Sequence, residues 1–183
     1  YRRQRQMCIR DSCKARRTLR KKLTTEGGMG MLKGRSENGG MERMMREELL
    51  VAVVDGQGGG MGRGLVEAVK KKWPRLHVRA LGTNSLATAA MLRAGADDGA
   101  TGENAVVVNC RSADIIVGPI GIVVADALLG EITPAMATAV CQSHATRVLI
   151  PVNHCENYIV GVPEQPISDL VAAAVQKLSL IHI

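Results

Sequence analysis

Apolar residues follow two patterns that alternate along the chain. Short, largely apolar runs at residues 49–54, 114–117 and 147–151 lack the polar alternation of a half-exposed strand, and such runs are typical of strands buried on both faces of a parallel sheet. Between these runs, apolar residues return at helical spacing, as Leu65 and Val69 do. The alternation predicts a Rossmann-like α/β fold, in which a single domain has a doubly wound, mostly parallel sheet between two layers of helices.

The remaining elements follow from the same patterns. Residues 103–110 are ambiguous, because the VVV run favours a strand, whereas Glu103 in a first turn after Thr101 favours a helix; we favour the helix. The polar, glycine-rich loop 95–102 has room for a minimal strand. The other predicted strands cover residues 77–81 and 158–162, and the other predicted helices cover residues 62–73, 85–93, 122–129 and 167–177, with one more that begins at Thr133 and Pro134.

The first predicted strand leads directly into residues 56–62, of which five are glycine. A strand, a glycine turn and a helix in this order direct backbone N–H groups and a positive helix end toward an anion. A tight turn without a ligand needs fewer glycines, because each one adds entropy to the unfolded chain. The segment therefore predicts a site for the phosphate of a nucleotide or of another phosphorylated small molecule. The predicted contacts are Gly56, Gln57, Gly58, Gly59, Gly60, Met61 and Gly62.

The spacing of these glycines matches no common nucleotide motif in full. The dinucleotide fingerprint GxGxxG needs a glycine where Met61 stands, and the GK[ST] of a Walker loop is absent. The spacing of Gly56, Gly60 and Gly62 resembles the turn of short-chain dehydrogenases, but the lysine that follows the tyrosine of that family is missing after Tyr158. Dehydrogenase activity is therefore disfavoured, while NAD(P) and other nucleotides stay open as the cofactor.

Two further segments are expected to flank this loop. No Asp or Glu directly follows the second predicted strand to hold a ribose hydroxyl; Asn84 and Ser85 stand there, and they suit either a ligand contact or a helix cap. Gly118, Pro119 and Gly121 follow the strand at residues 114–117. They are expected to form the far wall of a crevice where the strand order reverses, or else only a tight turn.

Candidate catalytic residues are few. Glu103, Asn153 and Cys155 lie at glycine-flanked or strand-terminal positions that suit acid–base or nucleophilic work. Each also has a structural explanation, since Glu103 suits a helix start and a cysteine in such a place is more often buried than reactive. The histidines and cysteines show no spacing typical of a metal site. Whether the protein is an enzyme stays open.

Charge and termini change the picture of the whole chain. Residues 1–40 hold 12 Lys and Arg against 3 Asp and Glu, whereas residues 41–177 hold 12 against 14, so the net charge of +7 comes from the beginning of the chain. Residues 1–12 and 178–183 match translated ends of a transposon-based sequencing adapter, RRQRQMCIRDS and LSLIHI, and we expect them to be foreign. We expect residues 13–48 to be a disordered leader or translated upstream DNA, followed by the domain at 49–177.

Several blocks of this domain together resemble a known family. Each block matches without internal gaps, and the blocks follow one another in the same order as in the bacterial family domain of unknown function 3842, which they resemble. The blocks are VVDGQGGGMGRGLVEAVKK, ALGTNSLATAAMLRAGADDGATGENAVVVN, ADIIVGPIGIV, ALLGEITPAMATAV and VLIPVNHC. The resemblance covers residues 49–162. It implies a compact Rossmann-like domain and no particular activity.

Three functions stay open on the sequence alone. The leading hypothesis is a cytoplasmic protein that binds a small phosphorylated ligand through residues 56–62. The alternatives are a small nucleotide-dependent enzyme and a ligand-free module that forms a homodimer through the apolar helix predicted at 122–129. A membrane span is not expected, because no apolar run is long enough. Nucleic acid is not an expected partner, because residues 41–177 are mildly acidic and have few aromatic residues to stack on bases.

Overall fold

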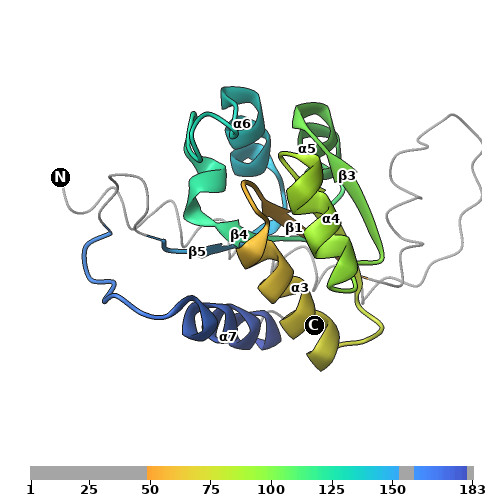
Figure 1. Ribbon diagram of the computed structural model, residues 1–183, viewed down its shortest axis with the longest axis vertical. Helices are drawn as coiled ribbons and strands as arrows, with labels where there is room; N and C mark the ends of the chain where they lie inside the picture. The colour runs from red at the N-terminus through yellow and green to blue at the C-terminus, as the bar shows by residue number, and fades with distance from the viewer. Residues whose placement is uncertain (1–48, 153–158, 181–183) are drawn as a thin grey trace, which may run out of the picture. The chain divides into compact units, whose positions relative to one another are not determined.

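The computed structural model describes residues 49–152 and 159–180, all within the compact unit Met44–Ile183. A central sheet carries helices on both faces (Figure 1). In chain order the elements are β1 (Leu50–Asp55), α3 (Gly60–Lys72), β2 (His77–Gly82), α4 (Ser85–Arg93), β3 (Asp98–Thr101), α5 (Glu103–Asn109), β4 (Ile115–Pro119), the 3-10 helix η1 (Ile120–Val123), α6 (Pro134–Gln142), β5 (Thr146–Ile150) and α7 (Ile167–Ser179).

The five strands are all parallel and lie in the order β3-β2-β1-β4-β5. β1 is central, with Ala52 opposite Arg79 of β2 on one side and opposite Ile116 of β4 on the other. The chain winds outward from β1 in one direction as far as β3 and then continues on the other side, so the order reverses between β1 and β4. This arrangement confirms the predicted doubly wound, Rossmann-like fold. In such sheets, ligands bind outside the carboxyl ends of the strands at this reversal.

The sheet separates two cores, because successive side chains of a strand point to opposite faces. Val51 and Val53 of β1 pack in the core that includes α3, Met91 of α4, and α7, whereas Ala52 and Val54 pack in the core that includes α5 and α6. Every residue of β1 is buried. Burial on both faces explains why the first apolar run shows no polar alternation.

Two helices begin at the capping residues that the sequence indicates. The side chain of Asn84 accepts a hydrogen bond from the N–H of Ala87 at 2.9 Å at the start of α4. Thr133 accepts one from the N–H of Met136 at 3.2 Å at the start of α6, where Pro134 is the first helical residue. The ambiguous segment after Thr101 is the helix α5, and the loop before it contains the short strand β3.

The last described helix, α7, extends to Ser179. Its Leu178 is fully buried in the core beneath α3 and the sheet. The adapter origin expected for residues 178–183 stays a prediction. Of the helices that the structure describes, none combines the length and the apolar character needed to cross a bilayer.

The helix predicted at residues 122–129 is wrong. After η1 the backbone turns through left-handed conformations at Asp126 (φ 62°), Leu128 (φ 55°) and Leu129 (φ 58°). The N–H of Asp126 donates to the carbonyl of Ile132 at 2.8 Å and closes a loop. The apolar residues that suggested a helix therefore lie on a loop, which we call the β4–α6 loop (residues 124–133).

The strand predicted at residues 158–162 is also wrong as far as it is described. Tyr158 lies outside the described residues, and residues 159–162 form a turn in which the N–H of Val162 donates to the carbonyl of Ile159 at 3.3 Å. Gly161 is left-handed (φ 87°). This conformation interrupts the extended backbone that the apolar residues suggested.

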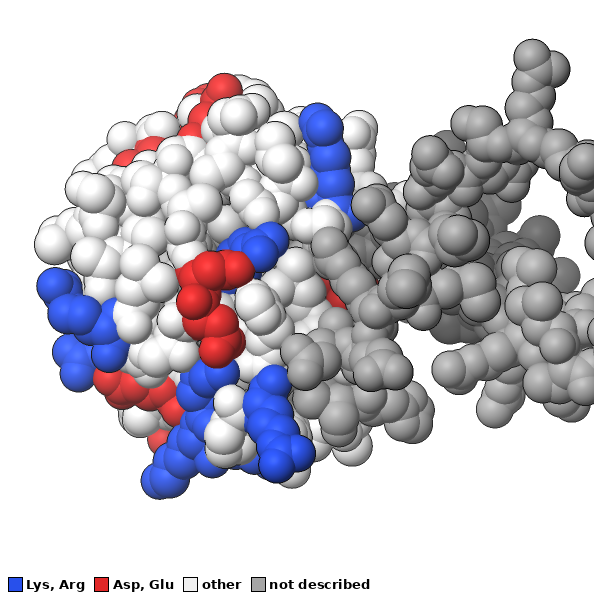
Figure 2. Space-filling model, turned by 90° about the vertical axis from the view of Figure 1, so that its right-hand side faces the viewer, with Lys and Arg blue, Asp and Glu red and all other residues white. Residues whose placement is uncertain are grey.

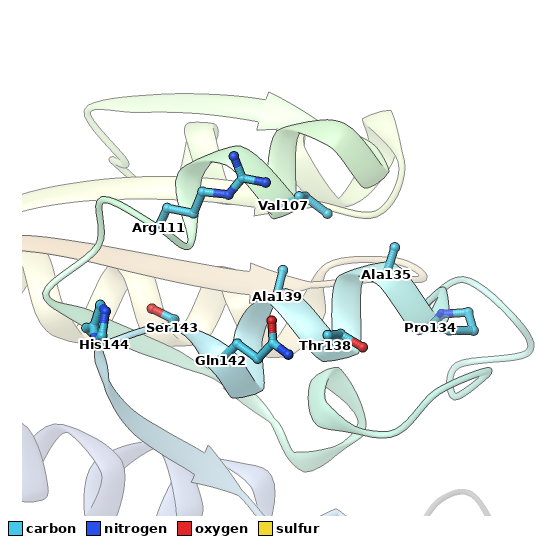
Figure 3. Close-up of a pocket in the computed structure, with 9 residues that line it drawn as sticks. All are labelled: Val107, Arg111, Pro134, Ala135, Thr138, Ala139, Gln142, Ser143 and His144. Carbon is cyan, nitrogen blue, oxygen red and sulfur yellow. The ribbon is translucent and has the colours of Figure 1, made fainter.

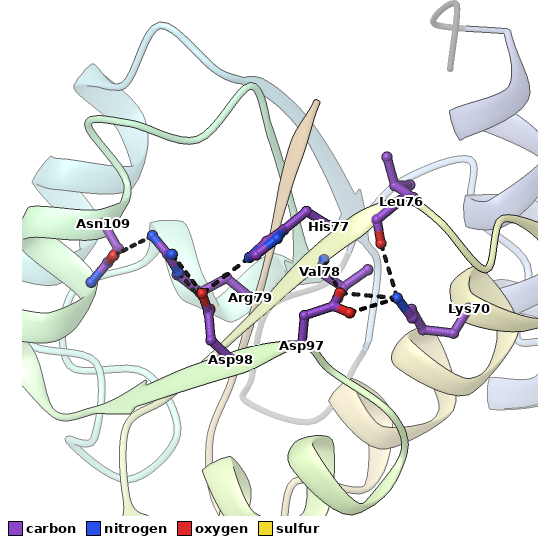
Figure 4. A network of polar contacts seen from close by, with 8 residues as sticks. All are labelled: Lys70, Leu76, His77, Val78, Arg79, Asp97, Asp98 and Asn109. Carbon is purple, nitrogen blue, oxygen red and sulfur yellow. Dashed lines mark hydrogen bonds and ion pairs between the residues drawn. The ribbon is translucent and has the colours of Figure 1, made fainter. Parts of the chain in front are cut away.

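Ion pairs gather at the amino ends of β2 and β3 (Figure 4). The glycine turn (residues 56–62) lies at the other edge of the sheet, where the strands end. Asp98 accepts hydrogen bonds from Nε and Nη2 of Arg79, each at 2.6 Å, and lies 3.0 Å from Nε2 of His77. The bond from Arg79 is the main reason that the pKa of Asp98 lies below its ordinary value. Lys70 pairs with Asp97 at 2.9 Å. Basic and acidic side chains also lie beside one another on the face shown in Figure 2.

Candidate ligand-binding site

The glycine turn stands at the carboxyl end of β1 and leads into α3. The N–H of Gly59 donates to the carbonyl of Gly56 at 2.9 Å, and the N–H of Arg63 donates to the carbonyl of Gly59 at 2.9 Å. Gln57 (φ 50°) and Gly59 (φ 68°) are left-handed. The turn directs the first N–H groups of α3, the positive end of its dipole, toward the space outside the sheet.

Three of the five glycines are closely packed against neighbouring segments. A Cβ at Gly56 would lie 2.8 Å from side-chain oxygens of two neighbouring segments. At Gly59 it would lie 2.6 Å from the backbone of Ala87, and the left-handed φ there also favours glycine. At Gly62 it would lie 2.6 Å from the sulfur of Met91. Close packing of the turn against β2, α4 and the β4–α6 loop therefore explains these three residues.

The other two glycines, Gly58 and Gly60, have no such explanation. Both are exposed, neither has a left-handed φ, and a Cβ built at either one meets no atom within 4 Å. Their backbone N–H groups have no hydrogen-bond partner among the residues that the structure describes. Gly58 and Gly60 thus present bare backbone and two available donors to open space.

A buried carboxylate, Asp55, lies beneath the turn. Its Oδ1 accepts from the N–H of Gly56 at 2.8 Å and its Oδ2 accepts from the N–H of Gly62 at 2.6 Å, while the residue is only 5% exposed. Burial raises the pKa of Asp55 above its ordinary value; these two hydrogen bonds oppose that rise, and the nearby charge of Glu131 adds to it. Asp55 is not among the residues predicted from the sequence, because an acidic residue after an apolar run resembles an ordinary strand end.

A second carboxylate, Glu131, reaches the turn from the β4–α6 loop. Its Oε2 accepts hydrogen bonds from the N–H of Gln57 at 2.8 Å, from Nδ2 of Asn84 at 3.0 Å and from the hydroxyl of Thr83. Asn84 also donates to the carbonyl of Gln57 at 2.9 Å. Donors from the carboxyl ends of β1 and β2 therefore converge on one oxygen of Glu131.

These donors determine the ionisation of Glu131. Burial alone would raise its pKa, but the hydrogen bonds from Thr83, Gln57 and Asn84 outweigh burial and place the pKa below its ordinary value. Glu131 is therefore a carboxylate at neutral pH. An acidic side chain from a distant loop thus lies at the carboxyl end of β2, although none directly follows β2 in the sequence.

A cavity of about 710 Å³ opens beside the turn, between the carboxyl ends of β1 and β4. The glycine turn forms one wall, and η1, the β4–α6 loop and residues near the start of α7 form the rest. Most of the lining is apolar. The lining residues are Asp55, Gly56, Gln57, Gly58, Gly59, Gly60, Met61, Pro119, Ile120, Gly121, Val124, Ala127, Leu128, Leu129, Val152, Ile159 and Ile167.

The remaining predicted site residues lie elsewhere. Gly118 does not line the cavity, and a Cβ there would clash with the carbonyl oxygen of Val54 in β1, so close packing of the two strands explains this glycine. Ser85 is the exposed first residue of α4, and Glu103 is the exposed first residue of α5. Asn84 caps α4 and contacts the turn without lining the cavity. Asn153 and Cys155 lie outside the described residues. Within residues 49–152 and 159–180, no three His, Cys, Asp or Glu side chains are placed to hold a metal ion.

A second cavity of about 690 Å³ lies between α5 and α6 (Figure 3). Val107 and Arg111 line it from the side of α5, and Thr138, Gln142 and His144 line it from the side of α6. It lies on an outer helical surface, away from the carboxyl ends of the strands, and none of the predicted site residues lines it.

Comparisons with known proteins identify the family. A family model described as Domain of unknown function (DUF3842) matches residues 50–182, so the chain belongs to this family and the resemblance found in the sequence is confirmed. A comparison with curated proteins gives no match. A crystal structure described as a dodecameric FMN-dependent Ubix-like decarboxylase from Escherichia coli O157:H7 is similar, with 17% identity and a TM-score of 0.37 over 71% of this chain and 75% of that one. A likeness of this extent says nothing about the ligand of the present chain.

Proposed function

We propose that this member of the family binds a phosphorylated small molecule of the nucleotide class in the cavity beside the glycine turn. The phosphate accepts hydrogen bonds from the N–H groups of Gly58 and Gly60, and the rest of the ligand lies against the apolar wall. The observation that supports this most strongly is that neither a positive φ nor close packing explains why these two positions lack a side chain.

Glycine lowers the stability of a fold wherever the fold does not need it. A glycine in place of alanine destabilises a folded chain by about 0.4–1 kcal/mol, chiefly because it adds freedom to the unfolded state. The fold needs that freedom or that space at Gly56, Gly59 and Gly62, but not at Gly58 and Gly60. A ligand that approaches the backbone closely gives both residues a reason, and the N-terminus of α3 favours an anion there.

The remaining lining suits the body of such a ligand. Pro119, Ile120 and Val124 after β4, with Leu128 and Leu129 of the β4–α6 loop, offer an apolar surface for a planar ring. The volume lies within the usual range for small-molecule sites, roughly 300–1,000 Å³. Asn84 lies beside the turn without lining the cavity, and its side-chain amide is already engaged by Gln57, Glu131 and Ala87, so we assign it no direct contact with the ligand.

A thermal-shift screen tests this proposal. The panel contains NAD, NADP, ATP, GTP, S-adenosylmethionine, sugar nucleotides and simple phosphates. A ligand at a hundred times its Kd stabilises by about 2.7 kcal/mol, which raises the Tm by several degrees. We expect at least one compound to do so, and we expect Gly60→Val to abolish its effect. Gly64→Val is the control, because Gly64 lies one turn further along α3. A Cβ built at Gly64 would meet no atom closer than Cγ2 of Val171, at 3.9 Å.

Two outcomes would contradict the proposal: a panel without any stabilising compound, or stabilisation that Gly60→Val leaves unchanged. The alternative of a ligand-free homodimer has lost the surface predicted for it, since residues 122–129 form no α-helix. The alternative of an enzyme uses the same cavity, where Asp55 is the ionisable group that lines it.

A further inference from the structure

We propose that Asp55 and Glu131 make the cavity selective for ligands whose phosphate groups carry one negative charge each, as in phosphodiesters and the pyrophosphate of dinucleotides. Ligands that end in a doubly charged phosphate monoester are excluded. This inference rests on the proposed function and specifies the ligand class of the same site.

Most hydrogen-bond donors around the turn already have acceptors within the protein. Asp55 already uses the N–H groups of Gly56 and Gly62, and Glu131 already uses that of Gln57. Glu131 also uses the side-chain donors at the end of β2. The N–H groups of Gly58 and Gly60 are left for a ligand. Two carboxylates therefore occupy most of the donors that a phosphate-binding turn would otherwise offer.

The described lining of the cavity carries no positive side chain that could balance a phosphate. Among the described residues that line the cavity, Asp55 is the one ionisable side chain, and no Lys, Arg or His lines it. The lysines of α3 are Lys70, Lys71 and Lys72 in its last turn. They stand roughly 15 Å along the helix axis from its first residue. Arg63, the fourth residue of α3, does not line the cavity, and its Nε pairs with Glu67 at 2.9 Å. No Lys, Arg or His among the described lining residues is therefore available to neutralise a phosphate.

The positive charge that the turn offers to a phosphate is small. The N-terminus of α3 supplies about half a positive charge, and Asp55 already draws on it. That leaves little to offset one negative charge and nothing to offset a second. Each extra unit charge beside a carboxylate is repelled in proportion to 1/r, and the repulsion is stronger in an apolar cavity than in water. The apolar wall adds affinity that does not depend on charge, so an esterified phosphate with an apolar substituent fits best.

Two small probes that differ by one methyl group and one charge test the inference. Phenyl phosphate is a dianion above its second pKa of about 6, whereas methyl phenyl phosphate is a monoanion. Each is titrated up to ~20 mM while the amide resonances of Gly58 and Gly60 are followed by NMR. At a pH of about 8 we expect the monoanion to bind about tenfold more tightly than the dianion.

A variant of Glu131 identifies the origin of this preference. Glu131→Gln keeps the size and one acceptor oxygen but removes the charge, so we expect it to reduce the preference for the monoanion about threefold or more. Glu164→Gln is the matched control, since it removes the same charge from an exposed residue that lines neither cavity. We expect this control to leave the preference unchanged.

The outcomes separate the two proposals. If phenyl phosphate shifts both amides at least as strongly as its methyl ester in the unsubstituted protein, the site stands and the charge selectivity is overturned. A preference that persists fully in Glu131→Gln overturns the role of that residue. If neither probe shifts Gly58 and Gly60, the proposed phosphate site itself is wrong.

Discussion

Replacing single glycines of the turn by alanine provides a stringent test of their different roles. Gly60→Ala places a Cβ in open space at the first residue of α3 and in an allowed backbone conformation. The unfolded chain loses freedom and the helix gains a better former, so we expect stabilisation by about 0.5–1 kcal/mol. Gly58→Ala is expected to have a smaller effect in the same direction.

The same change at Gly59 has the opposite sign. An alanine there must adopt a left-handed φ, which costs about 1–2 kcal/mol. Its Cβ would also lie 2.6 Å from the backbone of Ala87, which cannot move without shifting α4. At Gly62 the added Cβ would lie 2.6 Å from the sulfur of Met91 and 2.7 Å from the Cβ of Asp55, an overpacking that typically costs about 1–3 kcal/mol. The two groups of variants should therefore differ in stability by about 2 kcal/mol.

Urea unfolding of the four variants measures this difference, with the m-value as a check that the folded and unfolded states stay comparable. We expect Gly58→Ala and Gly60→Ala to be at least as stable as the unsubstituted protein, and both to bind the ligand found in the screen more weakly. Loss of stability at Gly58 or Gly60 as large as that at Gly59 would refute the reasoning, because these glycines would then serve the fold.

Three further predictions concern the rest of the fold. The pKa of Asp98 is lowered by its bond to Arg79, so its contribution to stability is present at neutral pH and should be lost as the pH falls below about 4; Asp98→Asn should flatten that decline in urea unfolding. Burial raises the pKa of Cys110 to about 11, so iodoacetamide should label exposed Cys141 and spare Cys110 until the protein unfolds, as located by mass spectrometry. Leu178→Ala should destabilise by about 2–5 kcal/mol in thermal unfolding, because it empties a fully buried position.

The regular elements of the fold could be predicted because their signals are local. Residues 50–54 of β1 are all apolar, as expected for a strand that is buried on both faces. Asn84 and Thr133 mark helix starts through hydrogen bonds to residues three positions later. The β4–α6 loop could not be predicted in this way, because left-handed backbone at Asp126, Leu128 and Leu129 leaves no trace in apolar spacing.

The candidate site was predictable only in part. The glycine turn is visible in the sequence, but the two groups of glycines within it are not, since neighbours such as Ala87 and Met91 come from another helix. Nothing in the sequence around Glu131 distinguishes it from other polar loop residues. Its place beside the turn depends on contacts with Gln57 and Asn84, which lie 74 and 47 residues away in the chain.

A crystal structure of the protein with the most stabilising compound of the screen would show whether the two glycines bind the ligand. We expect an anionic group of the ligand to accept hydrogen bonds of about 2.7–3.2 Å from the N–H groups of Gly58 and Gly60, with the rest of the ligand against Ile120 and Leu128. A ligand bound elsewhere, for example in the groove between α5 and α6, with both N–H groups left uncontacted, would contradict it.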